Sequence, residues 1–319
     1  MTSAVLITGG LGYVGGRIAQ ALQHSGQFRL RLATRSAAPP PLAWLPDAET
    51  VTLDVTSEAD LDKACKGVSS IIHLAALNEH ECLADPQRAL TVNGLGTLKL
   101  LQAAQRAGVG RFVYFSTAHV YGAPLTVRID ETSVPRPIHP YAITHRTAED
   151  FVLAAQAMGT LTGVVLRMSN GFGAPAHAGV NRWTLIVNDL CRQAATTGKL
   201  TMRSAGLDQR NFIALADVGR ASLHVLNLAN ESIGDGLYNL GGRTSLRVID
   251  LAKLIAQRCE VILGHRPPIV HPVATGEVPP TLDYRSDRLS ATGFDVSASM
   301  NDEIDATLRL CQASFGEAR

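Results

Sequence analysis

The sequence carries no excess of charge of either sign. Its 29 Lys and Arg residues are matched by 28 Asp and Glu residues, and the formal net charge is +1. No basic block of the kind that binds nucleic acid or an anionic membrane occurs along the chain. We therefore expect neither nucleic acid nor a membrane surface as the main partner, whereas this charge does not exclude a small anionic ligand.

Long apolar runs and paired cysteine motifs are absent as well. No segment reaches the roughly 18 uninterrupted apolar residues of a membrane span, and the first strand-like run, 4–10, leaves no room for a signal peptide before it. The five cysteines are an odd set without a CxxC spacing, which is typical of a reducing compartment. We expect a soluble cytoplasmic protein with buried, free thiols at Cys65, Cys82, Cys191, Cys259 and Cys311.

Strand-like and helix-like patterns alternate through the first two thirds of the chain. Six β-branched runs are apolar on nearly all positions, as in a parallel sheet covered by helices: 4–9, 29–34, 50–55, 70–76, 111–117 and 163–169. Between them, helical spacing of apolar residues ends at Gly26 and near Gly108. This alternation predicts the α/β class, with a Rossmann-like doubly wound parallel sheet.

A glycine-rich turn joins the first strand to the first helix. In LITGGLGYVGGRIA, the residues Gly9, Gly12 and Gly15 have GxxGxxG spacing. Without side chains the backbone can approach a pyrophosphate, and the helix N-terminus offers free N–H groups to it. A tight turn without a ligand is the alternative, but the position between a strand and a helix favours dinucleotide binding.

The end of the second strand bears on the choice between NAD and NADP. It carries Thr34, Arg35 and Ser36 where an acidic residue would accept from a ribose 2′-hydroxyl. A guanidinium suits a 2′-phosphate, so Arg35 favours NADP slightly over NAD, the alternative being a solvated surface arginine. Asp54 is placed either to accept from the adenine amino group or to cap the helix that begins near Ser57.

Several motifs, taken in order, resemble one family. They are TGGLGYVG, HLAA, VNGLGT, FVYFSTAHVYG, HPYAITHRTAE, LRMSNGFGAP, QRNFIALADV and LYNLGG. Together they resemble the extended short-chain dehydrogenases/reductases of the NAD(P)-dependent nucleotide-sugar epimerase/dehydratase family. The resemblance implies a Rossmann domain that holds NAD(P), a C-terminal lobe for a nucleotide-linked sugar, and hydride transfer at a sugar carbon. It also implies a homodimer built on two helices from each subunit.

A change of pattern after Gly173 indicates where the chain divides into domains. Loop-rich sequence follows, with a helix expected around 183–197, and the tail holds only short elements. We predict that residues 1–173 with about 207–242 form the NAD(P)-binding Rossmann domain. Residues from about 174–206 with 243–319 are predicted to form the smaller substrate-binding lobe.

The resemblance assigns roles to individual residues. Thr117 matches the hydroxyl that binds the reacting oxygen, Tyr141 matches the general acid/base, and His145 completes the predicted catalytic set. The residues assigned to the cofactor are Gly9, Leu11, Gly12, Tyr13, Val14, Gly15, Arg35, Asp54, Val55, Leu74, Ala75, Ala76, Asn93, Tyr141 and His145. Those assigned to the substrate are Asn78, Thr117, Asn170 and Arg210.

His145 stands where the family has a lysine, four residues after the tyrosine. An ammonium about 5 Å from the phenolate lowers the tyrosine pKa by about two units at an effective dielectric of about 20. A neutral imidazole supplies no such field. Three hypotheses stay open: the histidine does part of the lysine's work, the activity is weak or acid-shifted, or the protein binds the cofactor without turnover.

Further differences from the family's usual residues narrow the range of expected reactions and substrates. Ala118 and His119 follow Thr117 where the family's dehydratases have an Asp–Glu pair, so we expect an epimerase first and a 4-keto-sugar reductase second. The segment 271–284 lacks an arginine that the family usually has, which weakens the case for uridine diphosphate. The adjacent residues Glu79–Cys82 cannot all reach one ion, so we expect no metal.

Overall fold

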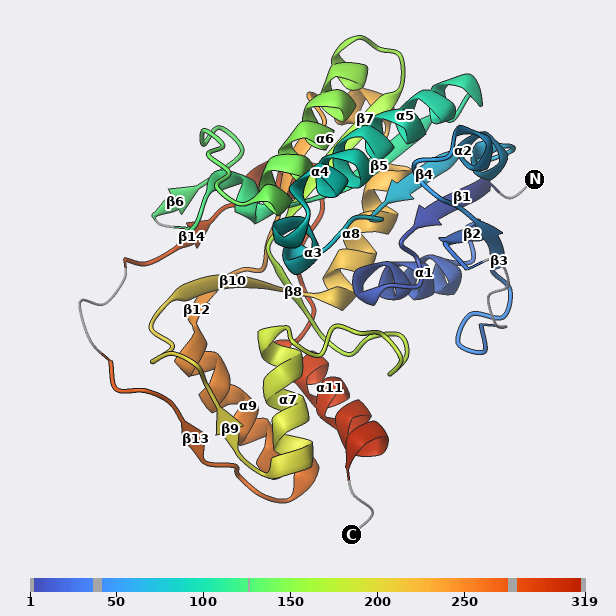
Figure 1. The fold of residues 1–319 in the computed structure, drawn as a ribbon. Coiled ribbons are helices and arrows are strands. Elements are labelled where there is room, and N and C mark those ends of the chain that lie inside the picture. Colours follow the sequence, from blue (N-terminus) through green and yellow to red (C-terminus); the bar gives the residue numbers. More distant parts are fainter. Residues whose placement is uncertain (1–2, 37–41, 126, 275–279, 317–319) are drawn as a thin grey trace.

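A parallel sheet of seven strands forms the centre of the protein. The computed structural model describes residues 3–36, 42–125, 127–274 and 280–316. The strands of this sheet are β1 (Ser3–Thr8), β2 (Phe28–Thr34), β3 (Glu49–Thr52), β4 (Ser70–His73), β5 (Arg111–Thr117), β7 (Thr162–Met168) and β11 (Leu237–Leu240). Their order is β11-β7-β5-β4-β1-β2-β3, and each neighbouring pair is parallel (Figure 1). The predicted α/β class with a doubly wound parallel sheet is confirmed.

Helices cover both faces of this sheet. The first face carries α1 (Tyr13–Ser25) and α8 (Leu215–Asn227), and the second carries α2 (Glu58–Cys65), α5 (Gly96–Arg106) and α6 (Pro140–Ala157). Side chains alternate along β1, so Val5 and Ile7 join the apolar cluster of the first face and Leu6 joins that of the second. A strand buried in this way is apolar at successive positions, which is the pattern that the sequence carries.

The chain reverses its direction across the sheet between β1 and β4. From β1 it proceeds through β2 and β3 to one edge, and from β4 it proceeds to the other edge. The loops that leave β1 and β4 therefore diverge at the carboxyl ends of the strands, where ligands bind in folds of this kind.

Buried hydrogen bonds hold the two strand ends at this switch point. Thr8 Oγ1 lies 2.6 Å from His73 Nδ1, and His73 Nε2 lies 2.9 Å from Thr97 Oγ1. Because the Thr97 hydroxyl donates to the carbonyl oxygen of Asn93, it accepts from Nε2–H of His73, and Thr8 donates to Nδ1. The Thr8 oxygen also accepts from the N–H groups of the two residues after His73. The chain segment that leaves β4 is thereby tied to β1.

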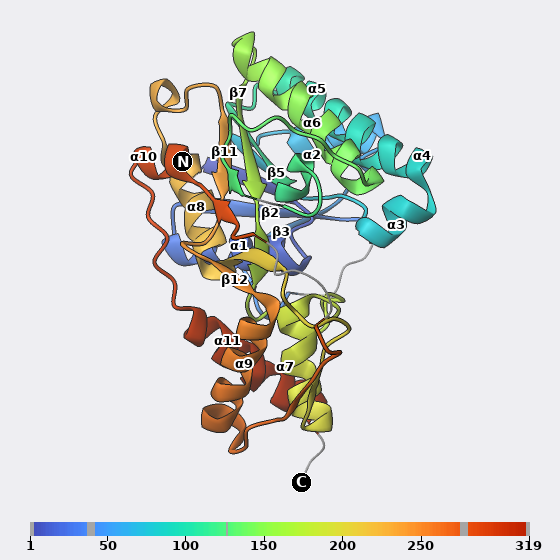
Figure 2. The same cartoon turned by 90° about the vertical axis from the view of Figure 1, so that its left-hand side faces the viewer.

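A smaller lobe lies beyond the carboxyl edge of the sheet (Figure 1, Figure 2). Its helices are α7 (Ile186–Thr197), α9 (Val248–Leu263) and α11 (Met300–Phe315), which pack around one apolar cluster. Its strands are β8 (Asn170–Phe172), β9 (Leu200–Thr201), β10 (Gln209–Ala214), β12 (Ser245–Arg247) and β13 (Ile269–Val270). The strands β8, β10 and β12 form one sheet, and β9 pairs with β13. The domain boundaries proposed near residues 173, 207 and 243 stay a prediction.

Polar contacts join α1 to the smaller lobe. Arg17 Nη2 lies 2.7 Å from Glu303 Oε1 of α11, and Arg17 Nη1 donates to the carbonyl oxygen of Ala174 at 2.7 Å. The Tyr13 hydroxyl donates to the carbonyl oxygen of Gly173 at 2.8 Å. The N-terminal half of α1 is therefore in direct contact with the segment that enters the lobe.

The remaining elements are short. They are α3 (Glu79–Ala84), α4 (Pro86–Ala89), η1 (Leu90–Leu95), η2 (Ala118–Tyr121), β6 (Arg128–Ile129), η3 (Asn230–Ser232), β14 (Asp283–Tyr284) and α10 (Asp287–Ala291).

The strand predicted to extend to Val55 ends at Thr52, because the Asp54 carboxylate accepts from the Thr56 N–H and turns the chain into α2. The edge strand β11 was not among the predicted strands. Within the described ranges, none of the helices is long and apolar enough to cross a membrane.

Candidate active site

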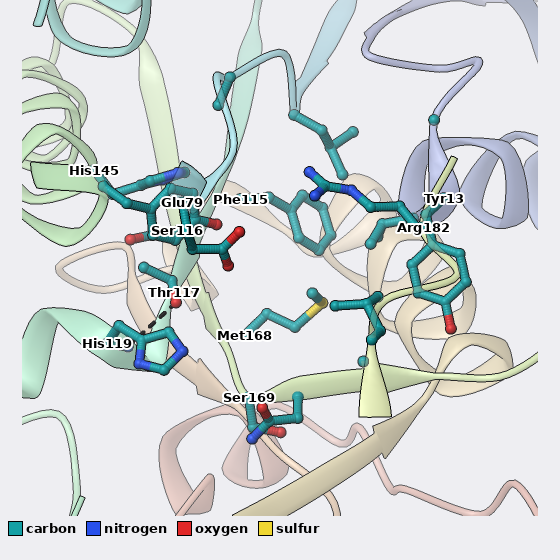
Figure 3. Close-up of a pocket in the computed structure, with 18 of the residues that line it drawn as sticks. Tyr13, Glu79, Phe115, Ser116, Thr117, His119, His145, Met168, Ser169 and Arg182 are labelled. Atoms are coloured by element: carbon teal, nitrogen blue, oxygen red, sulfur yellow. Dashed lines mark hydrogen bonds between the residues drawn. The ribbon is translucent and has the colours of Figure 1, made fainter. Parts of the chain in front are cut away.

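A cavity of about 350 Å³ opens at the switch point, between the sheet and the smaller lobe. Figure 3 shows side chains from β5, α6, α1 and the segment before α7 converging on it. The predicted site residues that line it are Gly9, Gly12, Tyr13, Val14, Gly15, Leu74, Ala75, Ala76, Thr117, Tyr141, His145, Asn170 and Arg210. Most of the residues assigned from the sequence, although far apart in the chain, therefore meet in one cavity.

The glycine-rich turn forms one wall of this cavity. Gly9 has a φ of +69°, and a Cβ atom on Gly15 would lie 2.2 Å from the carbonyl oxygen of Gly9, so a side chain at either position would strain the turn. Gly12 caps α1 without a side-chain hydrogen bond, so no capping side chain occupies the first N–H groups of the helix. The turn therefore presents N–H donors and the positive end of the helix dipole to an anion.

Thr117 and Tyr141 reach the cavity from different elements. Thr117 is the last residue of β5, and its Oγ1 accepts a hydrogen bond from the backbone N–H of His119 at 3.2 Å (Figure 3). Tyr141 lies in the first turn of α6, behind Pro140 at the helix start. The His139 side chain accepts from the Tyr141 N–H and so caps the helix. The end of a buried strand and a capped helix start are both rigid supports for reacting groups.

The surroundings of Tyr141 favour the protonated phenol. Burial raises the pKa of this phenol, and the carboxylate of Glu79 raises the pKa further. The guanidinium of Arg182 acts in the opposite direction. Tyr141 therefore rests as a neutral phenol at physiological pH unless a bound ligand changes the local charge.

His145 is buried beside Tyr141. Its Nδ1 lies 2.7 Å from the Tyr114 hydroxyl, and its ring centre lies 4.4 Å from that of Tyr141. Burial lowers the pKa of the His145 imidazole to about 3, and the nearby His119 lowers the pKa in the same direction. The imidazole is therefore neutral at physiological pH.

Three buried polar atoms of the cavity residues have no hydrogen-bond partner among the described residues. They are Ser116 Oγ, His145 Nε2 and Ser169 Oγ. Buried polar groups are nearly always hydrogen-bonded, because leaving one unpaired costs free energy. In this cavity the three atoms can form hydrogen bonds with a polar ligand or with water.

Some residues assigned to the cofactor lie away from the lining of this cavity, among them Leu11, Arg35, Asp54 and Val55. Arg35 is exposed at the end of β2. The Asp54 carboxylate accepts from Thr56 N–H at 2.8 Å and from its hydroxyl at 2.7 Å, which lowers the Asp54 pKa, and Arg35 lowers the pKa further. The cap of α2 is Ser57 and not Asp54.

Two of the assigned asparagines hold the backbone near the cavity. Asn93 Oδ1 accepts from the Leu77 N–H at 2.8 Å, and Asn93 Nδ2 donates to Thr144 Oγ1 of α6 at 3.1 Å. Asn93 therefore joins the segment after β4 to α6. Asn78, assigned to the substrate, caps α3 by accepting from the N–H groups of His80 and Glu81. Neither side chain lines the cavity.

The smaller lobe contributes two arginines to the cavity. Arg210 is an exposed residue of β10, and Arg182 precedes α7 and points into the cavity (Figure 3). Neither guanidinium is hydrogen-bonded or ion-paired to another side chain that the structure describes. Asn170, by contrast, lines the cavity while its Nδ2 donates to the carbonyl oxygen of Asn211 at 2.9 Å. Two free guanidinium groups in one cavity are suited to an anionic ligand.

Comparison with known proteins identifies the family to which this site belongs. The model of the NAD dependent epimerase/dehydratase family matches residues 5–241. The chain belongs to this family.

Relatives with a curated description are nucleotide-sugar enzymes. A UDP-glucose 4-epimerase from Rhizobium leguminosarum bv. trifolii is 36% identical over 183 residues, which are 56% of this chain and 55% of the relative. A mouse (Mus musculus) dTDP-D-glucose 4,6-dehydratase is 33% identical over 166 residues, 52% of this chain and 44% of the relative. The chain thus spans about half the length of these two relatives. A UDP-glucose 4-epimerase from Azospirillum brasilense is 29% identical over 305 residues, 89% of this chain and 84% of the relative.

Solved structures of the family share the fold over almost the whole chain. UDP-glucose 4-epimerase from Thermotoga maritima, solved with UDP-glucose, has a TM-score of 0.81 at 21% identity and covers 98% of this chain and 99% of its own. MoeE5, solved with UDP-glucuronic acid and NAD, has a TM-score of 0.77 at 26% identity and covers 98% of this chain and 100% of its own. NAD is thus the cofactor bound in a structural neighbour of this family member.

Family motifs do not account for every residue of the cavity. Arg182, Ser116 and Ser169 line it but were not among the predicted site residues. The only sequence signal for Arg182 is an arginine just before a predicted helix, which many surface arginines share. The arginine that the family usually has within 271–284 is missing from the sequence, and residues 275–279 of that segment lie outside the described residues.

Among the residues that the structure describes, no group of three or more His, Cys, Asp or Glu side chains could hold a metal ion. Glu79 lines the cavity, whereas its neighbour Cys82 is buried, with Sγ 3.4 Å from the Leu77 carbonyl oxygen.

The two buried histidines predict how stability depends on pH. Burial lowers the pKa values of His73 and His145 to about 3, whereas both titrate near 6.5 in the unfolded chain. Below about pH 6.5 the unfolded state therefore binds more protons than the folded state. As the pH decreases from about 6.5 towards 3, each histidine lowers the free energy of unfolding by up to about 1.4 kcal/mol per pH unit.

Replacing His145 with Gln should remove one proton from this dependence, and replacing the exposed His80 with Gln should not. Urea unfolding of both variants and the native chain at pH 4.5 to 6.5 measures the slope. Equal slopes for all three proteins would contradict a buried, neutral His145.

Proposed function

We propose that the protein is an NAD(P)-dependent epimerase that acts on a nucleotide-linked sugar. The observation that carries this proposal is the convergence of the glycine-rich turn, Thr117, Tyr141 and two free arginines on one cavity. The turn suits the cofactor, the two hydroxyls suit a reacting alcohol, and the arginines suit a diphosphate. The curated relatives, which include UDP-glucose 4-epimerases, support the same substrate class.

The cavity residues fit a nicotinamide dinucleotide. The free N–H groups behind Gly12 suit its pyrophosphate, and the unpartnered Ser116, Ser169 and His145 side chains suit its polar groups. When bound, the cofactor supplies the acceptor and donor of a hydride. Tyr141 and Thr117 handle the proton of the sugar hydroxyl. The phenolate oxygen of Tyr141 takes this proton as the carbon–oxygen bond becomes a carbonyl, and the Thr117 hydroxyl binds the same oxygen.

Epimerisation requires that Tyr141 return the proton when hydride comes back to the opposite face of the carbon. The substrate is then neither oxidised nor reduced overall, so no further reductant is needed. Dehydration needs a separate acid and base, and the positions after Thr117 carry Ala118 and His119. Burial lowers the pKa of His119, so this imidazole is a poor store of protons at neutral pH. A 4-keto-sugar reductase is the second candidate, since Thr117 and Tyr141 would handle the same proton.

Turnover should depend on Tyr141 and should rise with pH. Because His145 is neutral and burial raises the pKa of Tyr141, the reactive phenolate is scarce near pH 7. We expect kcat to rise up to about tenfold per pH unit between pH 7 and 9, and Tyr141→Phe to lower kcat by a factor of about 10² to 10⁴. Tyr238→Phe is the matched control, because that hydroxyl donates to the Ile233 carbonyl oxygen away from the cavity. Conversion of UDP- and dTDP-hexoses, followed by chromatography, provides the measurement.

Three results of this assay would exclude the proposed mechanism. Full turnover in Tyr141→Phe would remove Tyr141 as the acid/base. A rate that falls from pH 6 to 8 would indicate a cationic group instead of a neutral His145. Cofactor binding without conversion of any nucleotide hexose from pH 5 to 9 would favour a binding protein, a candidate that the neutral His145 supports.

The two arginines should bind the diphosphate of the substrate. Arg210→Gln is expected to raise KM for the nucleotide sugar by about 10- to 100-fold with little change in kcat, because hydrogen bonds to a charged group contribute about 1.5–3 kcal/mol. Arg182→Gln should raise KM similarly and also lower kcat, since Arg182 lowers the pKa of Tyr141. Arg192→Gln, which removes a surface pair with Asp189, is the control. Unchanged KM in both cavity variants would exclude a diphosphate at this place.

We infer that Arg35 gives the protein a preference for NADP over NAD. The guanidinium is exposed at the end of β2 and suits a 2′-phosphate, because a carboxylate at this place would repel it. Titration calorimetry should give a lower dissociation constant for NADP than for NAD. Arg35→Gln should weaken NADP binding by about tenfold and leave NAD binding unchanged. Tighter binding of NAD by the native chain would contradict the preference.

We also propose a homodimer. The elements α3 and η1 both contact α6. Exposed apolar side chains on these three elements are Leu83, Leu90, Leu95, Ile143 and Phe151, and α3 and α6 lie on the same side of the molecule (Figure 2). An apolar face of this kind favours association with an equal face. Light scattering should find a dimer for the native chain and a monomer for Leu95→Glu. The control Val261→Glu, at an exposed position of α9 in the other lobe, should stay dimeric. A monomeric native chain would contradict the proposal.

A further inference from the structure

The site contains a buried hydrogen bond that involves neither the glycine-rich turn nor the hydroxyls of Thr117 and Tyr141. It links Tyr114 of β5 to His145 of α6, with 2.7 Å between the phenolic oxygen and Nδ1. Tyr114 is 2% exposed and His145 is 4% exposed, so water does not compete for either group. The bond therefore determines how the imidazole carries its proton.

The partners of Tyr114 fix the direction of this bond. Its hydroxyl has no other hydrogen-bond partner among the residues that the structure describes. If Nδ1 of His145 donated to Tyr114, the O–H of Tyr114 would be a buried donor without an acceptor, which costs free energy. If Tyr114 donates to Nδ1, the Tyr114 O–H and Nδ1 are both satisfied, and Nε2–H alone remains without a partner among the described residues. The imidazole proton then resides on Nε2.

Nε2 of His145 is the ring atom that is available for a hydrogen bond with a ligand. The atom is buried, lacks a partner among the described residues, and belongs to a residue that lines the cavity. With the proton on Nε2, the ring presents one neutral N–H donor. The position thus keeps a hydrogen-bond donor although it lacks the charge of a lysine.

Within the part of the chain that the structure describes, the groups around this ring do not compensate a positive charge on it. His73 of β4 and His119 of η2 lie close, and neither imidazole can supply a negative charge. Tyr114 and Tyr141 are phenols whose pKa values burial raises, so neither is a counter-ion. Glu149, one turn further along α6, is bound by Arg167 of β7 through distances of 2.7 and 3.0 Å. Glu79 of α3 is exposed and acts on Tyr141.

We propose that Tyr114 is a positioning residue that holds His145 as the Nε2–H tautomer, so that this neutral donor binds an oxygen atom of the dinucleotide in the cavity. The tautomer follows from the two residues alone. The identity of the acceptor rests on the proposed cofactor function. The same bond also keeps the imidazole plane fixed beside Tyr141, with 4.4 Å between the ring centres.

Nitrogen NMR of the full chain labelled with ¹⁵N-histidine tests the tautomer without any turnover. Signals of His145 are assigned by their loss in His145→Gln. In the native chain we expect an unprotonated Nδ1 and a protonated Nε2, both unchanged from pH 5 to 8. Tyr114→Phe should shift part or all of the population to the Nδ1–H tautomer, whereas Tyr141→Phe should leave the native pattern. Nδ1–H or an imidazolium in the native chain at pH 7 would overturn the proposal even if Tyr114→Phe failed to fold.

Addition of NAD or NADP tests the acceptor. Saturation with the cofactor should shift the Nε2 signal of the native chain. Tyr114→Phe should raise the cofactor dissociation constant by about twofold to 12-fold, which is the usual contribution of one hydrogen bond. An unmoved Nε2 signal with bound cofactor would overturn the acceptor assignment. Failure of the proposed epimerase is a separate result, because it appears as bound cofactor and a shifted Nε2 without conversion of nucleotide hexoses.

Discussion

The reversal of the chain between β1 and β4 is the constraint from which the rest of the site follows. Two strands that end side by side send their loops in opposite directions, and the crevice between these loops needs no special sequence to exist. Buried hydrogen bonds among Thr8, His73 and Thr97 fix the strand ends. The glycine turn after β1 and the segment 74–77 after β4 can therefore form two rigid walls of one cavity.

The electrostatics of the site depend on burial more than on charge pairs. Tyr141 and His145 start the same helix, and burial moves the pKa of the phenol up and the pKa of the imidazole down. Both shifts favour the uncharged form. A lysine at position 145 would lower the pKa of Tyr141 through its positive charge, whereas the neutral histidine does not. The positive charge that lowers the pKa of Tyr141 comes from Arg182, which precedes α7 of the smaller lobe, so the position of this lobe affects the pKa of the phenol.

The sequence predicted the parts of the site that have local spacing. Gly9, Gly12 and Gly15 lie in one turn, and Thr117 and Tyr141 each end or begin a regular element, so short motifs identified them. Arg182 and Ser169 were missed because their place in the cavity depends on how the smaller lobe packs on the sheet.

Other roles could not be read from the sequence because they depend on distant partners. The charge state of His145 depends on burial and on Tyr114, which is 31 positions away in the chain. Asn78 and Asn93 lie at or near family motifs, yet neither side chain lines the cavity. Their side chains form hydrogen bonds with nearby backbone N–H groups, and Asn93 also with Thr144. β11 was missed because it is defined by its pairing with β7, which the sequence does not show.

In the proposed epimerisation, a hydride would leave a sugar carbon and return to it, and Tyr141 would move only the hydroxyl proton. Conversion of nucleotide hexoses that carry deuterium on every ring carbon tests it most directly. The account predicts an epimer that retains all of its deuterium in ordinary water, because hydride returns to the carbon that it left. An epimer in which one ring deuterium has been replaced by solvent hydrogen would contradict the account.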